Sequence, residues 1–274
     1  MFNIPKKVQE RFLKSIPEFQ RTIKKARDKD VNESDTVSII NDMLSKIFGY
    51  ERVDDITSQL SIRGTFCDLA IKGKDKFQYL IECKAIGHNL NKGNHVRQVV
   101  NYGANKGIPW IILTNAIEWY LYKIRFEQPI NYDQVMSINF DQINSRSNRD
   151  IELLYILTKE ALEKDAREIF FNKIRNVNKF IIGNLILNEN VTWVIKKELK
   201  KFAPNVHINS NDILEILKND IIKREILEDD EGKLAKQKID RFYKKIERQK
   251  IKKKETEQKL ETEDALSELE NPES

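Results

Sequence analysis

Two carboxylates and an ammonium interrupt a hydrophobic stretch that reads DLAIKGKDKFQYLIECKA. Asp68 precedes the turn residues 73–76, and Glu82 and Lys84 follow them. Because residues two apart in a strand share a face, Glu82 and Lys84 point the same way, and a hairpin closed at this turn places Asp68 opposite Glu82. Unpaired charge is costly to bury, so these groups either pair or line a functional site.

Metal-assisted hydrolysis of a phosphodiester is the chemistry that this set of side chains could support. Two carboxylates one cross-strand pair apart repel each other unless a cation lies between them. Mg²⁺ prefers carboxylate oxygens, completed by waters and a phosphate. Lys84 could position or deprotonate a water, or stabilise charge that develops on the phosphate. An ion-pair ladder on a solvated sheet face is the alternative that these residues alone leave open.

The surrounding pattern predicts the elements that would position these side chains. A first helix is expected within 32–50, where capping residues precede a stripe of apolar residues and Gly49 follows it. A second helix is expected within 95–107. The expected strands are 56–64, 65–72, 77–86, 108–114 and 118–124. The fourth of them is apolar throughout, which is typical of a strand covered on both faces.

This order of elements resembles that of the PD-(D/E)xK nuclease superfamily, with Asp68 in the second strand and the motif Glu82-x-Lys84 in the third. The closer resemblance is to the N-terminal nuclease domain of type I restriction enzyme R subunits, and it covers about residues 30–126. One departure is that Asp68 follows Cys67 rather than proline. The resemblance implies a restriction-endonuclease-like α/β core, in which helices flank a central mixed sheet.

The resemblance also implies roles for the acidic residues and the lysine. Asp68, Glu82 and Glu33 would bind Mg²⁺, with Mn²⁺ as a possible substitute, and Glu33 would come from the first helix. Lys84 would activate or orient the attacking water. Asp35 is close to Glu33 in the sequence, and either residue could instead cap the helix.

Residues that would contact the substrate are expected on the second helix. Gln98 and Tyr102 match the Gln-x-x-x-Tyr signature that the family shares with RecB-like nucleases, and residues four apart share a helical face. Arg97 on the same helix and Arg63 before the Asp68 strand are candidate phosphate contacts. A solvated surface is the alternative for both arginines.

The histidines and cysteines give weaker signals. His88 and His95 flank the loop after Lys84 and could touch phosphate, but loop histidines more often face solvent. Cys67 and Cys83 are the only cysteines and could be neighbours across the hairpin. Without a secretory signal, a cytoplasmic protein with reduced thiols is expected. No apolar run approaches the ~18 residues of a membrane span.

The C-terminal half is expected to be all-helical. The net charge of +5 and the pI near 8.9 favour polyanionic partners without proving them. The predicted parts are a broken N-terminal amphipathic helix (1–30), the nuclease-like domain (31–126), a polar linker (127–150), a helical domain (151–232) and a charged tail, helical or disordered (233–274).

Metal-dependent cleavage of DNA, in prokaryotic restriction or phage defence, is the function that the resemblance implies. The chain contains no Gly-x-x-x-x-Gly-Lys-[Ser/Thr] motif, so ATP-driven translocation is excluded on this chain. The helical half could form a homodimer or dock onto another subunit. The alternatives are a catalytically silent nuclease-fold module that binds nucleic acid or assembles with a partner, and a nuclease directed at RNA or branched substrates.

Overall fold

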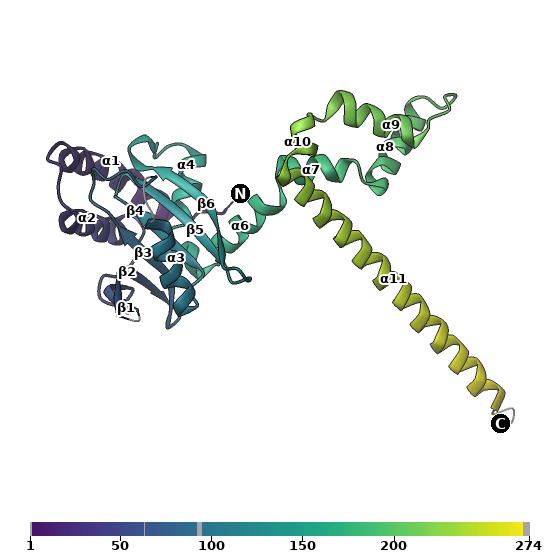
Figure 1. The fold of residues 1–274 in the computed structure, drawn as a ribbon, viewed down its shortest axis with the longest axis horizontal. Coiled ribbons are helices and arrows are strands. Elements are labelled where there is room, and N and C mark those ends of the chain that lie inside the picture. Colours follow the sequence, from purple (N-terminus) through teal and green to yellow (C-terminus); the bar gives the residue numbers. More distant parts are fainter. Residues whose placement is uncertain (1, 63, 92–94, 271–274) are drawn as a thin grey trace. The chain divides into compact units, whose positions relative to one another are not determined.

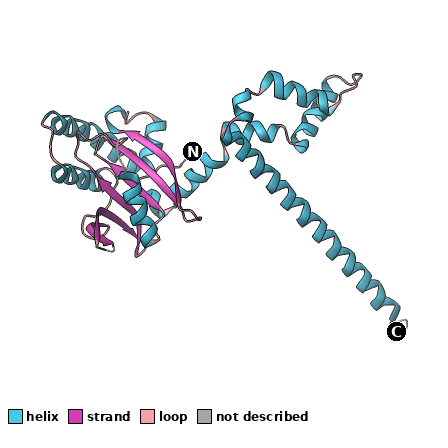
Figure 2. Ribbon diagram, viewed as in Figure 1, coloured by secondary structure: helices cyan, strands magenta, loops and turns pink. Residues whose placement is uncertain are grey.

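A computed structural model describes residues 2–62, 64–91 and 95–270 of the chain (Figure 1). The chain divides into two compact units, Met1–Lys173 and Ile174–Ser274. The first unit contains a mixed sheet with flanking helices, and the second is helical (Figure 2). The predicted α/β class with a helical C-terminal region is therefore confirmed.

The sheet of the first unit has six strands in the order β1-β2-β3-β4-β5-β6. Every neighbouring pair is antiparallel except β3 and β4, which run parallel. Parallel neighbours need a crossover, and helix α3 (His95–Lys106) supplies it. The strands are β1 (Ile56–Ile62), β2 (Thr65–Gly73), β3 (Lys76–Cys83), β4 (Trp110–Thr114), β5 (Glu118–Arg125) and β6 (Asn131–Asn139).

The β2–β3 hairpin has the register that the alternation of side chains predicts. Leu69 pairs with Ile81, so one step towards the open end of the hairpin places Asp68 opposite Glu82. The turn residues 74–75 both have positive φ, as a two-residue hairpin turn of this kind requires. The turn therefore sets which side chains meet at the open end.

Helices cover both faces of this sheet. On one face, α3 packs over a core that includes Ala70 and Leu80. Leu69 and Ile81 alternate with these residues, point to the other face and are fully buried. Helix α1 (Lys6–Asp28) packs with α2 (Glu33–Lys46), and α2 also contacts β3. Glu82 shares the face of Leu80, so it points to the α3 side.

Helix α1 is continuous, so the prediction of a broken helix was wrong. Pro17 lies inside it and cannot donate a backbone hydrogen bond to the turn before it. The helix nevertheless buries an apolar stripe against the rest of the unit, which offsets this local cost. The stripe consists of Val8, Phe12, Ile16, Phe19 and Ile23.

The linker predicted over 127–150 was also wrong, because β6 lies within it. This strand pairs with β5 from Asn131 to Asn139, and the short 3₁₀ helix η1 (Phe140–Gln142) follows. Within β6, Val135 and Ile138 are buried while several polar neighbours face outwards. A half-exposed edge strand carries few apolar residues, which is why its composition resembled that of a linker.

Three helices after β6 also contribute to the first unit, so this unit extends beyond residue 126. They are α4 (Asn148–Tyr155), α5 (Lys159–Glu163) and α6 (Ala166–Asn176), the last of which crosses the boundary after Lys173. Arg11 of α1 donates to both carboxylate oxygens of Glu160 in α5, at 2.9 and 2.8 Å. Arg167 of α6 is buried and donates to the carbonyl oxygen of Gln78 in β3 at 3.2 Å. These contacts join the later helices to the sheet unit.

The second unit packs short helices around a small apolar core that includes Ile213, Leu217 and Ile222. None of the helices in the described ranges is long and apolar enough to cross a membrane. The predicted tail belongs to a helix that continues to Glu270. The elements are α7 (Lys179–Ile186), α8 (Glu189–Phe202), α9 (Ser210–Ile216), the π-helical turn η2 (Leu217–Ile221), α10 (Arg224–Glu228) and α11 (Asp230–Glu270).

Candidate functional site

The candidate site lies at the carboxyl end of β3, beside the first turn of α2. Lys84 Nζ is 2.7 Å from Glu82 Oε1 and 3.9 Å from Oε2 of Glu33, the first residue of α2. The backbone N–H of Lys84 donates to the carbonyl oxygen of Thr114 at 2.9 Å, which continues the β3–β4 pairing beyond Cys83. The lysine is therefore held between two carboxylates from different elements.

Asp68 is fixed across the hairpin from this lysine. Its Oδ2 accepts a hydrogen bond from the backbone N–H of Cys83 at 2.7 Å. The charges of Lys84 and Glu33 both act on the Asp68 carboxyl. The structure thus brings together the four residues that the sequence proposed as catalytic.

Glu82 has one carboxylate oxygen that lacks a partner. The residue is 3% exposed, and its Oε1 accepts the hydrogen bond from Lys84. Its Oε2 is buried and has no hydrogen-bond donor among the residues that the structure describes. A buried acceptor without a partner costs on the order of 1–3 kcal/mol, more when it is charged. A divalent cation would satisfy this oxygen.

The donor set fits a hard cation, although the ligands are not drawn together into a complete cluster. Asp68 and Glu82 supply carboxylate oxygens, as Mg²⁺ and Mn²⁺ prefer. No group of three or more Asp, Glu, His or Cys side chains in the described ranges is close enough to hold a metal ion. One oxygen of Asp68 and one of Glu82 already accept N–H groups, and Glu33 Oε2 is nearest to Lys84.

Burial dominates the titration of the two strand carboxyls. It raises the pKa of Asp68 and of Glu82 above their ordinary values, against the opposing effect of Lys84. Burial alone would lower the pKa of Lys84, but the hydrogen bond to Glu82 and the surrounding carboxylates outweigh it, and the pKa is raised. Lys84 is therefore an ammonium at neutral pH, suited to orienting a water or stabilising negative charge.

The predicted substrate pair on α3 is joined by a hydrogen bond. Gln98 Nε2 donates to the Tyr102 hydroxyl at 2.8 Å. Tyr102 is buried in the core beneath α3 that also holds Ala70 and Leu80, and Gln98 is exposed. The pair therefore lies on the same side of the sheet as Glu82. Tyr102 orients the Gln98 amide, which remains available to a ligand.

Of the two predicted arginines, only Arg97 lies in the described residues, and it is not part of this arrangement. Arg97 is exposed on α3 and makes no ion pair with any residue that the structure describes. Arg63 lies outside the described residues.

A pair of histidines lies beside Lys84, a contact that the sequence reasoning did not predict. His88 Nε2 and His95 Nε2 are 2.9 Å apart, and the two rings meet edge to face. Burial lowers the pKa of His95, as do the charges of Lys84 and His88. The spacing of histidines around a loop does not predict that contact.

The cysteines are free and buried. Cys67 Sγ donates to the carbonyl oxygens of Leu69 and Ile81, both at 3.4 Å. Burial raises the pKa of Cys67 to about 12 and that of Cys83 well above its ordinary value. Both thiols are therefore protonated and unreactive at neutral pH.

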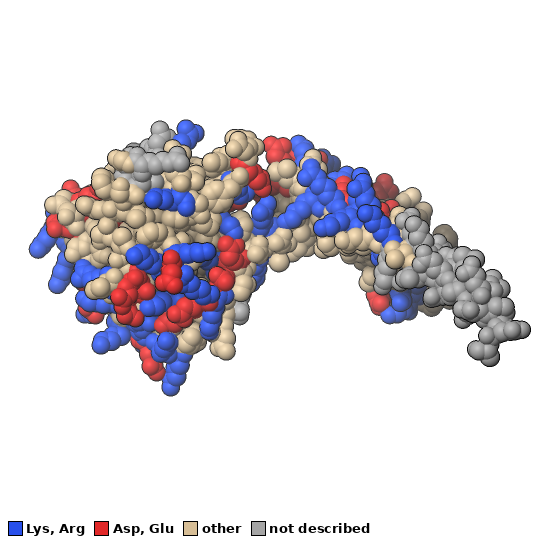
Figure 3. All heavy atoms as spheres, turned by 90° about the horizontal axis from the view of Figure 1, so that it is seen from below, with Lys and Arg blue, Asp and Glu red and all other residues tan. Residues whose placement is uncertain are grey.

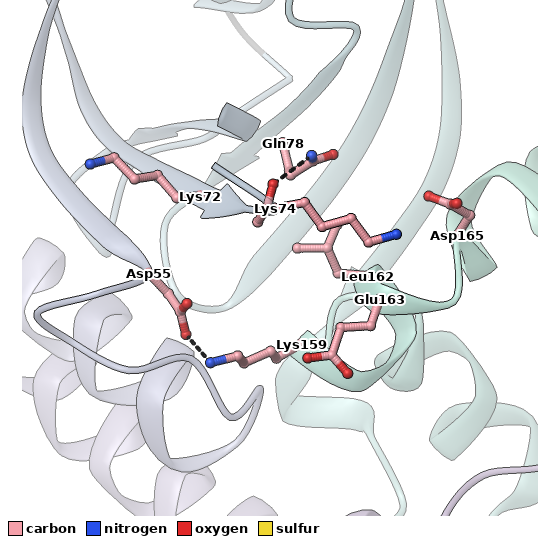
Figure 4. A pocket seen from close by; sticks show the side chains of 9 residues that line it. Asp55, Lys72, Lys74, Gln78, Lys159, Leu162, Glu163 and Asp165 are labelled. Atoms are coloured by element: carbon pink, nitrogen blue, oxygen red, sulfur yellow. Dashed lines mark hydrogen bonds and ion pairs between the residues drawn. The ribbon is translucent and has the colours of Figure 1, made fainter. Parts of the chain in front are cut away.

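A pocket of about 150 Å³ lies at the opposite end of the hairpin, beside its turn (Figure 4). None of the predicted site residues lines it. Lys159 and Asp55 form an ion pair of 2.7 Å across part of it. The lining residues are Asp55, Lys72, Gly73, Lys74, Gln78, Lys159, Leu162, Glu163 and Asp165. This ion pair joins α5 to the segment before β1, and we do not assign the chemistry to this pocket.

Comparisons with known proteins leave the family of this chain open. No family model, curated protein or solved structure matches it.

Proposed function

We propose that the chain is a Mg²⁺-dependent endonuclease that hydrolyses DNA phosphodiester bonds, in prokaryotic restriction or phage defence. The observation that carries the proposal is the buried, partnerless Oε2 of Glu82, which lies on the α3 face opposite Asp68 with the Lys84 ammonium beside it. An ion-pair ladder on a solvated face would leave no such oxygen. The succession α2, β1, β2, β3, α3, β4 is also the order expected of a PD-(D/E)xK core.

Each residue of the site has a role in this proposal. Asp68 and Glu82 hold Mg²⁺ or Mn²⁺, with Glu33 completing the acidic side of the site. The metal, when bound, polarises the phosphate and lowers the pKa of a bound water. Lys84 orients the attacking water and stabilises the negative charge that develops on the phosphate. These roles need the lysine to stay charged, which its raised pKa favours.

The substrate contacts come from the α3 side. Gln98, oriented by Tyr102, donates to the DNA backbone, and Arg97 and Arg63 neutralise neighbouring phosphates. Cleavage of both strands requires two sites, which a homodimer or a second subunit joined through the helical unit would supply. The cytoplasm, which invading DNA enters, is the proposed location.

Cleavage assays with the purified full chain test this function. Plasmid, linear duplex, single-stranded DNA and RNA are incubated with Mg²⁺, with Mn²⁺ or with EDTA. Cleavage of DNA is expected with either metal, and Asp68→Asn should abolish it. Asp133→Asn is the matched control, because it removes a carboxylate from β6, four strands from β2, where it pairs with Arg125 at 3.1 Å. Circular dichroism checks that both variants are folded.

The outcomes separate the alternatives. Cleavage by Asp68→Asn at the parental rate would reject the site. Cleavage of RNA alone would favour the RNA-directed nuclease. Salt-sensitive binding of nucleic acid without any cleavage, and without a requirement for divalent ions, would favour the catalytically silent module.

A further inference from the structure

Helix α11 carries five basic side chains in line, which we call the basic stripe. Their spacing of i, i+3, i+4, i+7 and i+11 places them on one helical face within about 100° of arc. At 1.5 Å per residue the stripe is about 16 Å long. All five side chains are exposed, and Lys and Arg gather on the second unit in Figure 3. The stripe consists of Arg241, Lys244, Lys245, Arg248 and Lys252.

The stripe lies on the side of α11 that faces away from its own unit. Ala235 and Ile239 are buried where α11 packs with α7, and helical spacing puts them on the side opposite to the stripe. The acidic residues of the same stretch, Asp240 and Glu247, lie about 90° and 110° from the centre of the stripe. None of the five cations forms an ion pair with a described carboxylate. Their charge is therefore not neutralised within the described chain.

The chemistry of the stripe fits a phosphate backbone better than a membrane. A helix that lies in a lipid surface needs a wide apolar face. Among the side chains of α11 that the structure describes, the large exposed apolar ones are Leu234, Phe242 and Ile251, and their spacing puts them on three different sides of the helix. Duplex DNA carries one negative charge per ~1.7 Å of its axis, so a stripe of this length meets several phosphates at once.

We infer that the basic stripe of α11 binds the DNA backbone without sequence preference and holds substrate for the site on the sheet unit. The choice of DNA as the polyanion rests on the proposed function. The acidic stretch 255–270 of a second copy of the chain is a competing polyanion. Pairing between copies is therefore an outcome that the test must distinguish.

The test measures binding of the full chain to a fluorescent 30-base-pair duplex in EDTA, so that no cleavage is needed. Anisotropy titrations at several KCl concentrations compare the parent with two variants that each lose five positive charges. The stripe variant replaces all five cations by Gln. The control variant replaces five exposed cations by Gln, four in α1 and one at its C-cap: Lys14, Arg21, Lys24, Lys25 and Lys29. Circular dichroism verifies that both variants are helical.

The stripe variant should bind at least about 100-fold more weakly than the parent near 100 mM salt. The slope of log K against log salt should fall in magnitude by about 4, because each phosphate contact contributes about 0.9 to it. The control variant should keep most of both affinity and slope. Equal losses in the two variants, or an unchanged slope in the stripe variant, would overturn the inference.

Sedimentation of the proteins without DNA tests whether the stripe instead binds a second copy of the chain. Loss of a dimer in the stripe variant, with DNA binding intact, would assign the stripe to pairing between copies and overturn the inference. The inference and the proposed function can also fail separately. Stripe-dependent binding in EDTA without cleavage in Mg²⁺ supports only the stripe, whereas cleavage with stripe-independent binding supports only the nuclease.

Discussion

Asp68→Asn should be more stable than the parent without a divalent ion and less stable than the parent when a divalent ion is added. The amide oxygen of Asn can still accept the hydrogen bond from Cys83, while the charge and a proposed metal ligand are lost. In EDTA, burial raises the folded-state pKa of Asp68, so ionisation of this carboxyl opposes folding. The stability associated with its protonated form is lost as the pH rises through the raised pKa. At pH 7.5 in EDTA, Asp68→Asn should therefore be more stable than the parent, and the difference should shrink below the ordinary carboxyl pKa.

The metal-dependent part of this prediction has a magnitude. A ligand at 100 times its Kd stabilises the folded state by about 2.7 kcal/mol. The first unit ends at Lys173. A unit of that size has an unfolding entropy of roughly 0.36 kcal/mol/K, so saturating Mn²⁺ should raise its Tm by about 7 °C. The Tm of Asp68→Asn should rise by less than about 2 °C, and the order of the two melting temperatures should reverse.

Scanning calorimetry of the full chain, with the first unit's transition followed in EDTA and in Mn²⁺, measures both effects. Asp133→Asn should keep the parental response to Mn²⁺, because its carboxyl is four strands away from β2. An equal Mn²⁺ shift in parent and Asp68→Asn would refute the assignment of Asp68 as a ligand. A less stable Asp68→Asn in EDTA would refute the argument from burial.

Three further changes test other parts of the structure. Lys84→Met should reduce cleavage about 10²–10⁴-fold. It should also lower the Tm, because the Glu82 carboxylate loses its hydrogen-bond donor. The double variant with Glu82→Gln should regain the Tm but not the cleavage. Gly103→Ala should lower the free energy of unfolding by about 1–3 kcal/mol in urea titrations, since the new methyl would lie 2.5 Å from an isoleucine methyl and 2.8 Å from a carbonyl oxygen. Arg11→Ala should lower the free energy of unfolding by about 2 kcal/mol at pH 7 in the same urea titrations. Burial alone would raise the pKa of Glu160, but Arg11 outweighs it and the pKa is lowered, so this loss should shrink as the pH falls through that pKa.

Local sequence patterns predicted the features that depend on residues close together in the sequence. Alternation in β2 and β3 predicted the register of the hairpin, because the side-chain period of a strand is two. The capping residues before α2 placed Glu33 in its first turn, where Asn32 caps the helix by accepting from the backbone N–H of Asp35. The alternative that Glu33 or Asp35 caps the helix was therefore wrong.

Local patterns failed where packing outweighs composition. A broken helix was predicted for residues 1–30, but the buried stripe of α1 holds this helix continuous across Pro17. The polar residues of β6 predicted a linker, but pairing with β5 satisfies their backbone groups while only one side of the strand is buried. Neither contact is visible in a short window of sequence.

The sequence by itself determined which side chains share a strand face, because that depends on neighbours two residues away. Only the tertiary structure decided which charges meet across elements. It brought Glu33 to Lys84, joined His88 to His95 and left Oε2 of Glu82 without a donor. Such contacts depend on how α2, the hairpin and the loop before α3 pack together. Burial then raises the pKa values of Asp68 and Glu82. This burial comes from residues distant in the sequence, so neighbouring residues do not predict it.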